Sequence, residues 1–226
     1  MEDSSQRCGV IAVVGAPNAG KSTLVNALVG QKVATTTPKA QTTRTGVMGV
    51  ALEGEAQLVL VDTPGVFAPA RRLDRAMVQS AWGGAQDADL IALVVDGRGG
   101  MGPKMEPILD GLAKRRETKW LVINKVDIAA KDKLLTLTER LHERVDFAET
   151  YYVSAATGDG LTELKGAMAK AAPEGPWHFP ADQVSDATDR LLSAEITREQ
   201  LYHQLHDELP YQTAVETEQY KEREDG

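Results

Sequence analysis

The chain contains one cysteine, few aromatic residues and no long hydrophobic run. Cys8 has no second cysteine to pair with, so a disulfide within the chain is excluded and a reducing cytoplasm is the expected location. The longest apolar runs, such as 90–95, are far shorter than the ~20 residues that a membrane-spanning helix needs. Residues 1–5 are acidic and polar, unlike a secretory signal. The sequence therefore predicts a soluble, cytoplasmic protein.

Positive charge is also scarce, because 25 lysine and arginine residues face 33 aspartate and glutamate residues in the 226-residue chain. The formal net charge is −8, and residues 186–226 hold eleven acidic and four basic side chains, a local balance of −7. Nonspecific binding to nucleic acid needs clustered lysine and arginine that displace counterions. The composition argues against such binding as a general property, and an RNA contact would need a local surface.

Short apolar runs alternate with segments of helical spacing over the first three quarters of the chain. Strands that are apolar on both faces are typical of parallel sheets with helices on either side. The sequence therefore predicts an α/β fold for residues 1–174, a three-layer sandwich around a mostly parallel sheet. A hairpin of 46–52 and 57–61 would add one antiparallel edge strand. The expected parallel strands lie at 10–14, 58–61, 90–95, 120–123 and 151–153.

The C-terminal quarter of the chain has a different composition. Residues 175–186 contain proline and lack any periodicity, which predicts a linker. In residues 187–226, the leucines of 191–209 recur at four-residue spacing and predict a helix, and 211–220 alternates like a strand. One helix and one strand cannot form a core of their own.

The segment GAPNAGKST, residues 15–23, joins the first apolar run to a helical segment. A tight turn would account for its glycines alone. The spacing G-x-x-x-x-G-K-[ST] indicates more, namely a loop whose backbone N–H groups cradle phosphates at a helix N-terminus. Lys21 is expected to reach the outer phosphates and Ser22 to ligand Mg²⁺. The predicted phosphate-binding residues are Gly15, Ala16, Pro17, Asn18, Ala19, Gly20, Lys21, Ser22 and Thr23.

The segment DTPG, residues 62–65, follows the apolar run 58–61. Its carboxylate is therefore expected at the carboxyl end of a strand, facing the same crevice as the phosphate loop. Asp62 could hold Mg²⁺ through water, and the N–H of Gly65 could contact a γ-phosphate. Taken alone, DTPG is also a β-turn signature.

The segment NKVD, residues 124–127, follows the apolar run 120–123 in the same way. Guanine offers N1–H and N2–H₂ donors that the carboxylate of Asp127 can accept together. Asn124 can bond O6 or brace the loop, and the stem of Lys125 can cover the ring. After the last predicted strand, a backbone N–H of the SAA segment can reach the guanine O6; its residues are Ser154, Ala155 and Ala156.

The four motifs all fall where apolar runs end, in the chain order phosphate, metal, base and base. Each motif alone has an ordinary explanation as a turn, but their shared position favours one ligand site. The set predicts the P-loop NTPase fold, with GTP or GDP and Mg²⁺ as ligands. Asn124 and Asp127 disfavour an ATP-dependent P-loop kinase.

With these motifs the chain resembles the TRAFAC class of GTPases, and in particular the Era family of bacterial ribosome-assembly GTPases. The likeness is carried by QKVATTTPKAQTTRTGVMGV at 31–50, together with GxPNxGKSTL and DTPGV. The segment SAEITREQLYHQLHDELPY, residues 193–211, resembles the entry into the KH domain of that family. The resemblance extends over roughly residues 9–220.

The resemblance implies that KAQTTR, residues 39–44, is switch I. Thr43 would then ligand Mg²⁺ and contact the γ-phosphate, with Thr42 as the alternative. Residues 65–75 would form switch II, which the γ-phosphate orders. On this reading the catalytic residues are Lys21, Thr43, Asp62 and Gly65, and the metal ligands are Ser22, Thr43 and Asp62.

Val66 stands where Ras-like enzymes place a glutamine that orients the attacking water. Because valine has no polar side-chain atom, intrinsic hydrolysis is predicted to be slow. The sequence identifies no arginine finger, although Arg44, Arg71 and Arg72 lie in or near the predicted switches. Asn18 matches the position at which related GTPases use K⁺, so stimulation by K⁺ is a hypothesis.

The Era family binds the 3′ end of small-subunit rRNA through its KH domain and promotes subunit maturation. The resemblance therefore implies 16S rRNA and the small ribosomal subunit as partners, with peripheral association at the inner face of the plasma membrane; a monomer is expected. A KH domain clamps RNA with a GXXG loop, and none follows Tyr211. Residues 187–226 are predicted to hold only the first helix and first strand of that domain. GRGG, residues 97–100, belongs to the GTPase domain.

Two other functions stay open at the level of sequence. One is another Era-related assembly or tRNA-modification GTPase. The other is a nucleotide-gated binding module with negligible turnover.

Overall fold

The fold was analysed in a computed structural model of the chain. The structure describes residues 6–34, 47–62 and 88–184, and beyond them residues 194, 196, 197, 199–201, 204 and 215. The predicted switch segments and the predicted C-terminal strand 211–220 lie outside the described residues, apart from Val215.

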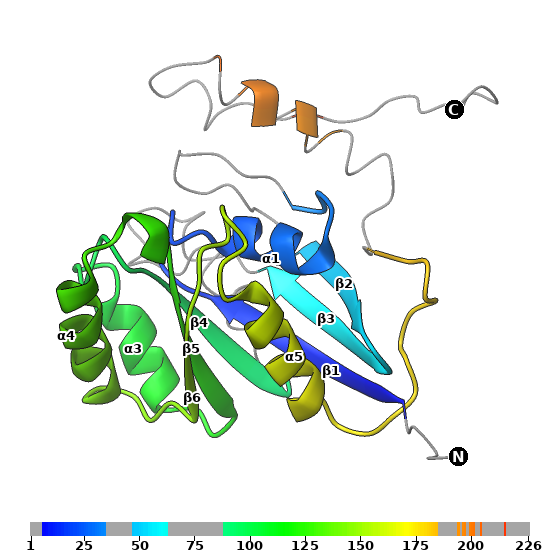
Figure 1. Cartoon of the computed structure of the whole chain (residues 1–226), viewed down its shortest axis with the longest axis horizontal. Helices are drawn as coiled ribbons and strands as arrows, with labels where there is room; N and C mark the ends of the chain where they lie inside the picture. The colour runs from blue at the N-terminus through cyan, green and yellow to red at the C-terminus, as the bar shows by residue number, and fades with distance from the viewer. Residues whose placement is uncertain are drawn as a thin grey trace.

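A six-stranded sheet forms the centre of the molecule, in the order β2-β3-β1-β4-β5-β6 (Figure 1). β2 runs antiparallel to β3 at one edge, and the other neighbours are parallel. This arrangement confirms the predicted α/β class with one antiparallel edge strand. The strands are β1 (Arg7–Val14), β2 (Val47–Glu53), β3 (Ala56–Asp62), β4 (Leu90–Asp96), β5 (Thr118–Asn124) and β6 (Glu149–Tyr152).

Helices cover both faces of the sheet, because alternate residues of each central strand point to opposite sides. In β1, Ile11 and Val13 pack with α1 (Lys21–Val29) and α5 (Leu161–Ala171). Ala12 and Val14 face the opposite layer. That layer consists of α3 (Glu106–Ala113) and α4 (Lys131–His142), and a short 3₁₀ helix, η1 (Val126–Ile128), follows β5.

The helix α4 was not predicted from the sequence, because eight of its twelve residues are threonine, lysine, aspartate, glutamate, arginine or histidine, which leaves only a narrow apolar stripe. Leu134, Leu137 and Leu141 form that stripe and are buried against the sheet. The strands β1, β3, β5 and β6 also begin earlier than the predicted apolar runs do, whereas β4 begins with its run at Leu90. β3, for instance, starts at Ala56 because Gln57 is buried despite its polarity.

The predicted linker is bound to the sheet over much of its length. Gln57 is fully buried, and its Oε1 accepts hydrogen bonds from the backbone N–H groups of His178 (2.9 Å) and Phe179 (3.0 Å). Its Nε2 donates to the Phe179 carbonyl at 2.8 Å. The backbone N–H of Val50 in β2 donates to the Val184 carbonyl at 2.8 Å. Residues 173–184, which we call the strap, thus run beside β3 and β2 (Figure 1).

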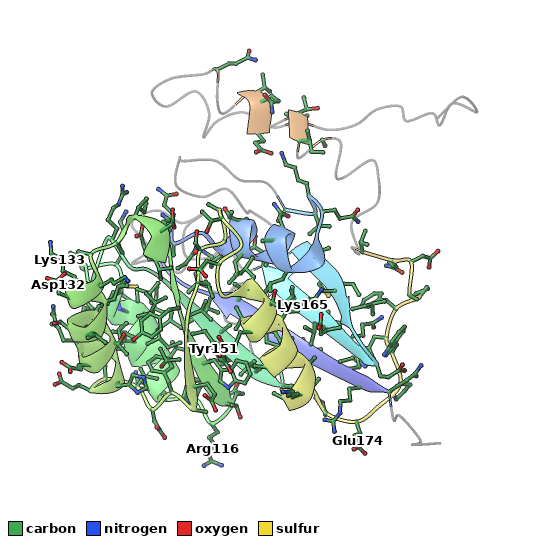
Figure 2. All side chains as sticks on the ribbon, viewed as in Figure 1. Arg116, Asp132, Lys133, Tyr151, Lys165 and Glu174 are labelled. Carbon is green, nitrogen blue, oxygen red and sulfur yellow. The ribbon has the colours of Figure 1, made fainter. Side chains whose placement is uncertain are left out.

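The strap begins where α5 ends. The N–H of Cys8 donates to the Pro173 carbonyl at 3.1 Å, and Arg7 Nη1 donates to the Ala172 carbonyl at 2.7 Å. Arg7 Nη2 also pairs with Glu174 at 3.3 Å. Glu174 is labelled in Figure 2. The position of the chain that leaves the sheet is therefore fixed by backbone hydrogen bonds rather than by apolar packing alone.

The described residues between 194 and 204 are helical, within the predicted helix 191–209. Glu199 is buried and pairs with Lys32, which follows α1, at 2.5 Å. The boundaries predicted at residues 174 and 186, and the KH-like nature of 187–226, stay predictions. Among the described residues, no helix is both long and apolar enough to cross a membrane.

Candidate nucleotide-binding site

The phosphate-loop motif lies between β1 and α1, as predicted. Steric contacts explain why positions 15 and 20 are both glycine. Gly15 has φ +153°, and a Cβ there would collide with the carbonyl oxygen of Val94 in the neighbouring strand. Gly20 has φ +95° and closes the loop at the N-terminus of α1, where a Cβ would collide with the side-chain amide of Asn124. A side chain at either position would push the loop away from the sheet.

The side chain of Lys21 folds back over the loop. Its Nζ donates to the carbonyls of Gly15 and Ala16, both at 3.2 Å, and the side chain is almost fully buried. Burial lowers the pKa of Lys21, and the negative charge of Asp62 opposes that shift. Because a buried ammonium is stabilised by nearby negative charge, this position is suited to an anion such as a phosphate.

Ser22 and Asp62 come together across the start of α1 and the end of β3. Ser22 Oγ donates to Asp62 Oδ2 at 2.6 Å, and both side chains are buried. A hydroxyl and a carboxylate are oxygen ligands of the kind that Mg²⁺ takes, with substrate phosphates completing the set. Among the described residues, no group of three His, Cys, Asp or Glu side chains could hold a metal by itself. The pair therefore fits Mg²⁺ bound together with phosphates.

Asn124 is the hydrogen-bonding centre of the site. Its Nδ2 donates to the carbonyl of Ala19 in the phosphate loop at 3.0 Å. Its Oδ1 accepts from the N–H of Lys125 at 2.8 Å and from the N–H of Ala155 at 3.0 Å. Of the two roles considered for Asn124, the structure has it brace the loops. One buried amide thereby joins three of the four predicted motifs.

Lys125 adopts a left-handed conformation, with φ +65°. Its Nζ lies 2.6 Å from the carbonyl oxygen of Asn18 and 2.6 Å from Asp96 Oδ2. Asp96 was not among the site residues predicted from the sequence. The signal was present, because Asp96 ends the apolar strand β4 just as Asp62 ends β3, but no motif marks it.

Asp127 lies in η1, and its side chain is exposed. Ser154 is buried, and its Oγ accepts from the N–H of Thr157 at 3.2 Å. Ala155 is held by Asn124, whereas Ala156 is exposed. The SAA segment therefore stands beside the NKVD segment, as the sequence predicts, and its last residue faces outward.

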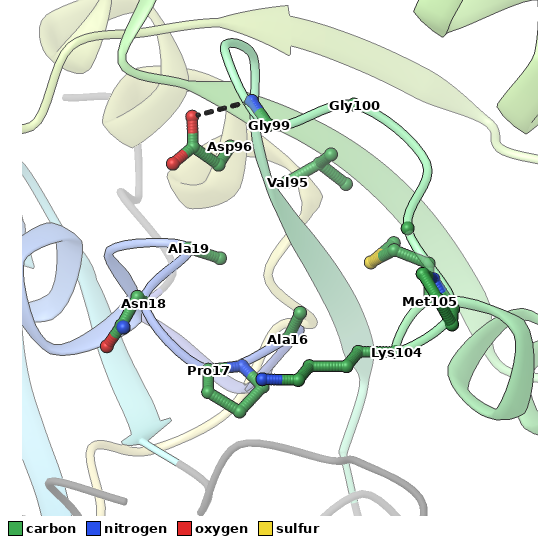
Figure 3. Close-up of a pocket in the computed structure, with 12 residues that line it drawn as sticks. Ala16, Pro17, Asn18, Ala19, Val95, Asp96, Gly99, Gly100, Lys104 and Met105 are labelled. Carbon is green, nitrogen blue, oxygen red and sulfur yellow. Dashed lines mark hydrogen bonds between the residues drawn. The ribbon is translucent and has the colours of Figure 1, made fainter. Parts of the chain in front are cut away.

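A pocket of about 370 Å³ borders the phosphate loop on the side of the β4–α3 connection (Figure 3). It lies between residues 16–19 of the loop and residues 95–105, and Asp96 is one of the residues that line it. The predicted switch residues Thr42, Thr43, Gly65 and Val66 lie outside the described residues, as do Arg44, Arg71 and Arg72.

The glycine loop at the N-terminus of α1 and the motif loops at the carboxyl ends of parallel strands define the class of P-loop nucleoside triphosphatases. Comparison with known proteins identifies the family. The profile of the 50S ribosome-binding GTPase family matches residues 10–125. GTPase Era of Erythrobacter litoralis is 60% identical over 230 residues, which is 100% of this chain and 76% of that protein.

Two solved structures agree with this result. Era in complex with MgGDPNP and nucleotides 1506–1542 of 16S ribosomal RNA is 38% identical, with a TM-score of 0.85 over 91% of this chain and 70% of that one. An Aquifex aeolicus Era variant bound to GDP·AlF4⁻ is also 38% identical, with a TM-score of 0.84 over the same shares. The chain belongs to the Era family of GTPases. The comparisons do not favour the other Era-related families considered above.

Gly20→Ala tests the steric argument for the phosphate loop. The added methyl would collide with the Asn124 amide, and a left-handed alanine costs about 1 kcal/mol. We expect affinity for GDP to fall about tenfold or more, measured by displacement of a fluorescent GDP analogue.

Gly166→Ala is the matched control, because this glycine lies within α5 and a Cβ there meets nothing within 4 Å. It should leave GDP affinity unchanged and stabilise the helix by about 0.5–1 kcal/mol. Wild-type affinity in Gly20→Ala would contradict the predicted role of the loop.

Proposed function

We propose that this chain binds GTP with Mg²⁺ at the four assembled motifs, hydrolyses it to GDP and phosphate, and acts as a switch in assembly of the small ribosomal subunit. The observation that carries this proposal is the Asn124 amide, which ties the phosphate loop, the NKVD segment and the SAA segment into one site. Membership of the Era family supports the substrate and the process.

The phosphates would be bound by the N–H groups of residues 15–23 and by Lys21, which would turn from the loop carbonyls toward them. Ser22 and Asp62 would hold Mg²⁺, which when bound neutralises phosphate charge. Thr43, or Thr42 in its place, and the N–H of Gly65 are the proposed contacts near the γ-phosphate. Since phosphoryl transfer depends mainly on positioning and charge, these groups supply most of the catalysis that we assign to the chain.

The guanine base would be read by three neighbouring segments. The exposed Asp127 carboxylate would accept from N1–H and N2–H₂, and the stem of Lys125 would cover one face of the ring. The N–H of Ala155 already bonds Asn124. We therefore assign the contact with O6 to the next backbone N–H, that of Ala156.

The partner is proposed from the family. A solved Era structure contains nucleotides 1506–1542 of 16S rRNA, and this chain covers 70% of that protein. We propose that this chain also binds the 3′ end of 16S rRNA. A monomeric state and peripheral membrane association rest on the resemblance alone, and sedimentation analysis and vesicle flotation would test them.

Asp127→Asn tests the reading of the base. An amide in place of the carboxylate loses two hydrogen bonds to guanine, each worth about 1.5–3 kcal/mol when one partner is charged, and it can donate to the C2 carbonyl of xanthine. GTP affinity should fall by about two orders of magnitude while XTP becomes the preferred ligand. Isothermal titration with both nucleotides measures the ratio.

Asp132→Asn is the control for this experiment, because Asp132 is an exposed carboxylate in the first turn of α4 (Figure 2). It should keep the preference for GTP. If Asp127→Asn also keeps that preference, the assignment of the base site is wrong.

Hydrolysis is proposed to be slow and stimulated by K⁺ near Asn18, since Val66 cannot orient water. Turnover at saturating GTP should be several-fold faster in K⁺ than in Na⁺ buffer, measured as released phosphate. Asn18→Ala should bring the two rates together. Equal wild-type rates in both salts would remove K⁺ from the mechanism.

Binding to RNA should be specific and dependent on GTP, because the acidic chain offers little nonspecific attraction. The test is fluorescence anisotropy of an RNA with the mature 3′ end of 16S rRNA, with a nonhydrolysable GTP analogue or GDP, over a range of salt. An RNA of scrambled sequence is the control. Equal affinity for both RNAs would contradict the proposed partner.

A further inference from the structure

Asp96 connects the β4–α3 turn to the proposed base site. Its Oδ2 accepts from Lys125 Nζ at 2.6 Å, and its Oδ1 accepts from the backbone N–H of Arg98 at 2.9 Å. The same Oδ1 accepts from the backbone N–H of Gly99 at 3.2 Å, the bond drawn in Figure 3. The carboxylate is therefore held by its own turn while it holds the lysine. Its orientation does not depend on Lys125 alone.

The Lys125 ammonium is fixed from a second direction by the phosphate loop. Its other contact is the carbonyl oxygen of Asn18 at 2.6 Å. The two acceptors come from different loops, so the long side chain is stretched between β4 and the phosphate loop. A lysine with two fixed acceptors at its tip loses most of its rotamer freedom before any ligand arrives.

The surroundings of Asp96 favour its charged form. Burial acts to raise the pKa of Asp96, but the hydrogen bond from Lys125 and those from the Arg98 and Gly99 amides outweigh it, and the pKa is lowered. The next residue, Gly97, donates its N–H to the Asn124 carbonyl at 2.8 Å. A Cβ on Gly97 would lie 3.1 Å from that same oxygen and closer still, 2.7 Å, to Leu134, so the turn packs tightly against the base-reading loop.

We propose that Asp96 is a positioning residue for the nucleotide, which holds Lys125 stretched along the phosphate loop so that its methylene stem is ready to cover the guanine ring. This inference rests on the proposed role of Lys125 in base binding. It assigns a function to a residue that touches no nucleotide itself. Asp96 acts through Lys125 alone, and this separates it from Asn124, which braces three loops directly.

The inference has a kinetic signature. Asp96 contacts the base-reading side of the site, so its loss should weaken GDP and GTP binding by the same factor. The KM for GTP should rise, while kcat at saturating GTP stays at the wild-type value. A residue that affected the γ-phosphate would lower kcat instead.

The decisive experiment is a double-mutant cycle that compares wild type, Asp96→Asn, Lys125→Met and the double variant. The measured quantity is the dissociation rate of a fluorescent GDP analogue under stopped flow. We expect Asp96→Asn to raise that rate about fivefold, since a charge-assisted hydrogen bond at a partly exposed site is lost. The double variant should dissociate no faster than Lys125→Met alone.

Asparagine keeps one acceptor oxygen for the turn, so thermal melting of Asp96→Asn should stay close to that of the wild type. Asp110→Asn is the matched control: it removes a carboxylate that pairs with Arg144 at 2.9 Å on the outer side of α3, and it should not change the dissociation rate.

Three outcomes would overturn the inference. An unchanged rate in Asp96→Asn would show that the carboxylate serves its own turn only. If the factors by which the two single substitutions raise the dissociation rate multiply in the double variant, Asp96 does not act through Lys125. If Lys125→Met itself leaves the rate unchanged, the proposed role of Lys125 fails and the inference falls with it, and this third result is distinguishable from the first two.

Discussion

The side-chain amide of Asn124 is the interaction on which the site depends. It is buried at the carboxyl end of β5 and bonds the phosphate loop, its own loop and the loop after β6. A buried polar group left without its hydrogen bond costs about 1–3 kcal/mol. Moving any one of the three loops away from Asn124 would therefore carry such a penalty. The same amide leaves no room for a Cβ at Gly20, so the close contact between Asn124 and the phosphate loop requires glycine at that position.

The sheet makes this interaction available. Because β1, β3, β4 and β5 are parallel, segments separated by about a hundred residues end at the same edge. The strands that bring them there are apolar on both faces and covered by helices on both sides. Polar side chains, such as those of Asp62, Asp96 and Asn124, then stand at the carboxyl ends of β3, β4 and β5, along one edge of the sheet.

Sequence reasoning recovered the parts of this structure that local chemistry fixes. Glycine spacing, apolar runs and the polar residues after them placed the glycine loop between β1 and α1, and Asp62 and Asn124 at the ends of strands, since each position depends on few neighbours. It missed Asp96 because an aspartate followed by glycine reads as an ordinary turn until Lys125 is known to lie beside it. It read residues 175–186 as a plain linker, because nothing local indicates that Gln57, more than a hundred residues earlier, binds their backbone.

The Arg144 ion pairs and the Lys125–Asp96 ion pair differ in solvent exposure and in geometry. Arg144 pairs with Glu106 and Asp110 where all three side chains are at least 37% exposed, so solvent screening leaves these pairs little effect on folding stability. Lys125 and Asp96 are 27% and 22% exposed, so this pair too contributes little to folding stability. The Lys125–Asp96 pair differs from the Arg144 pairs in its geometry. Two backbone N–H groups hold the carboxylate in place, and the Asn18 carbonyl accepts a hydrogen bond from the ammonium. The effect of such a pair therefore lies in where it holds the lysine stem rather than in the free energy of unfolding.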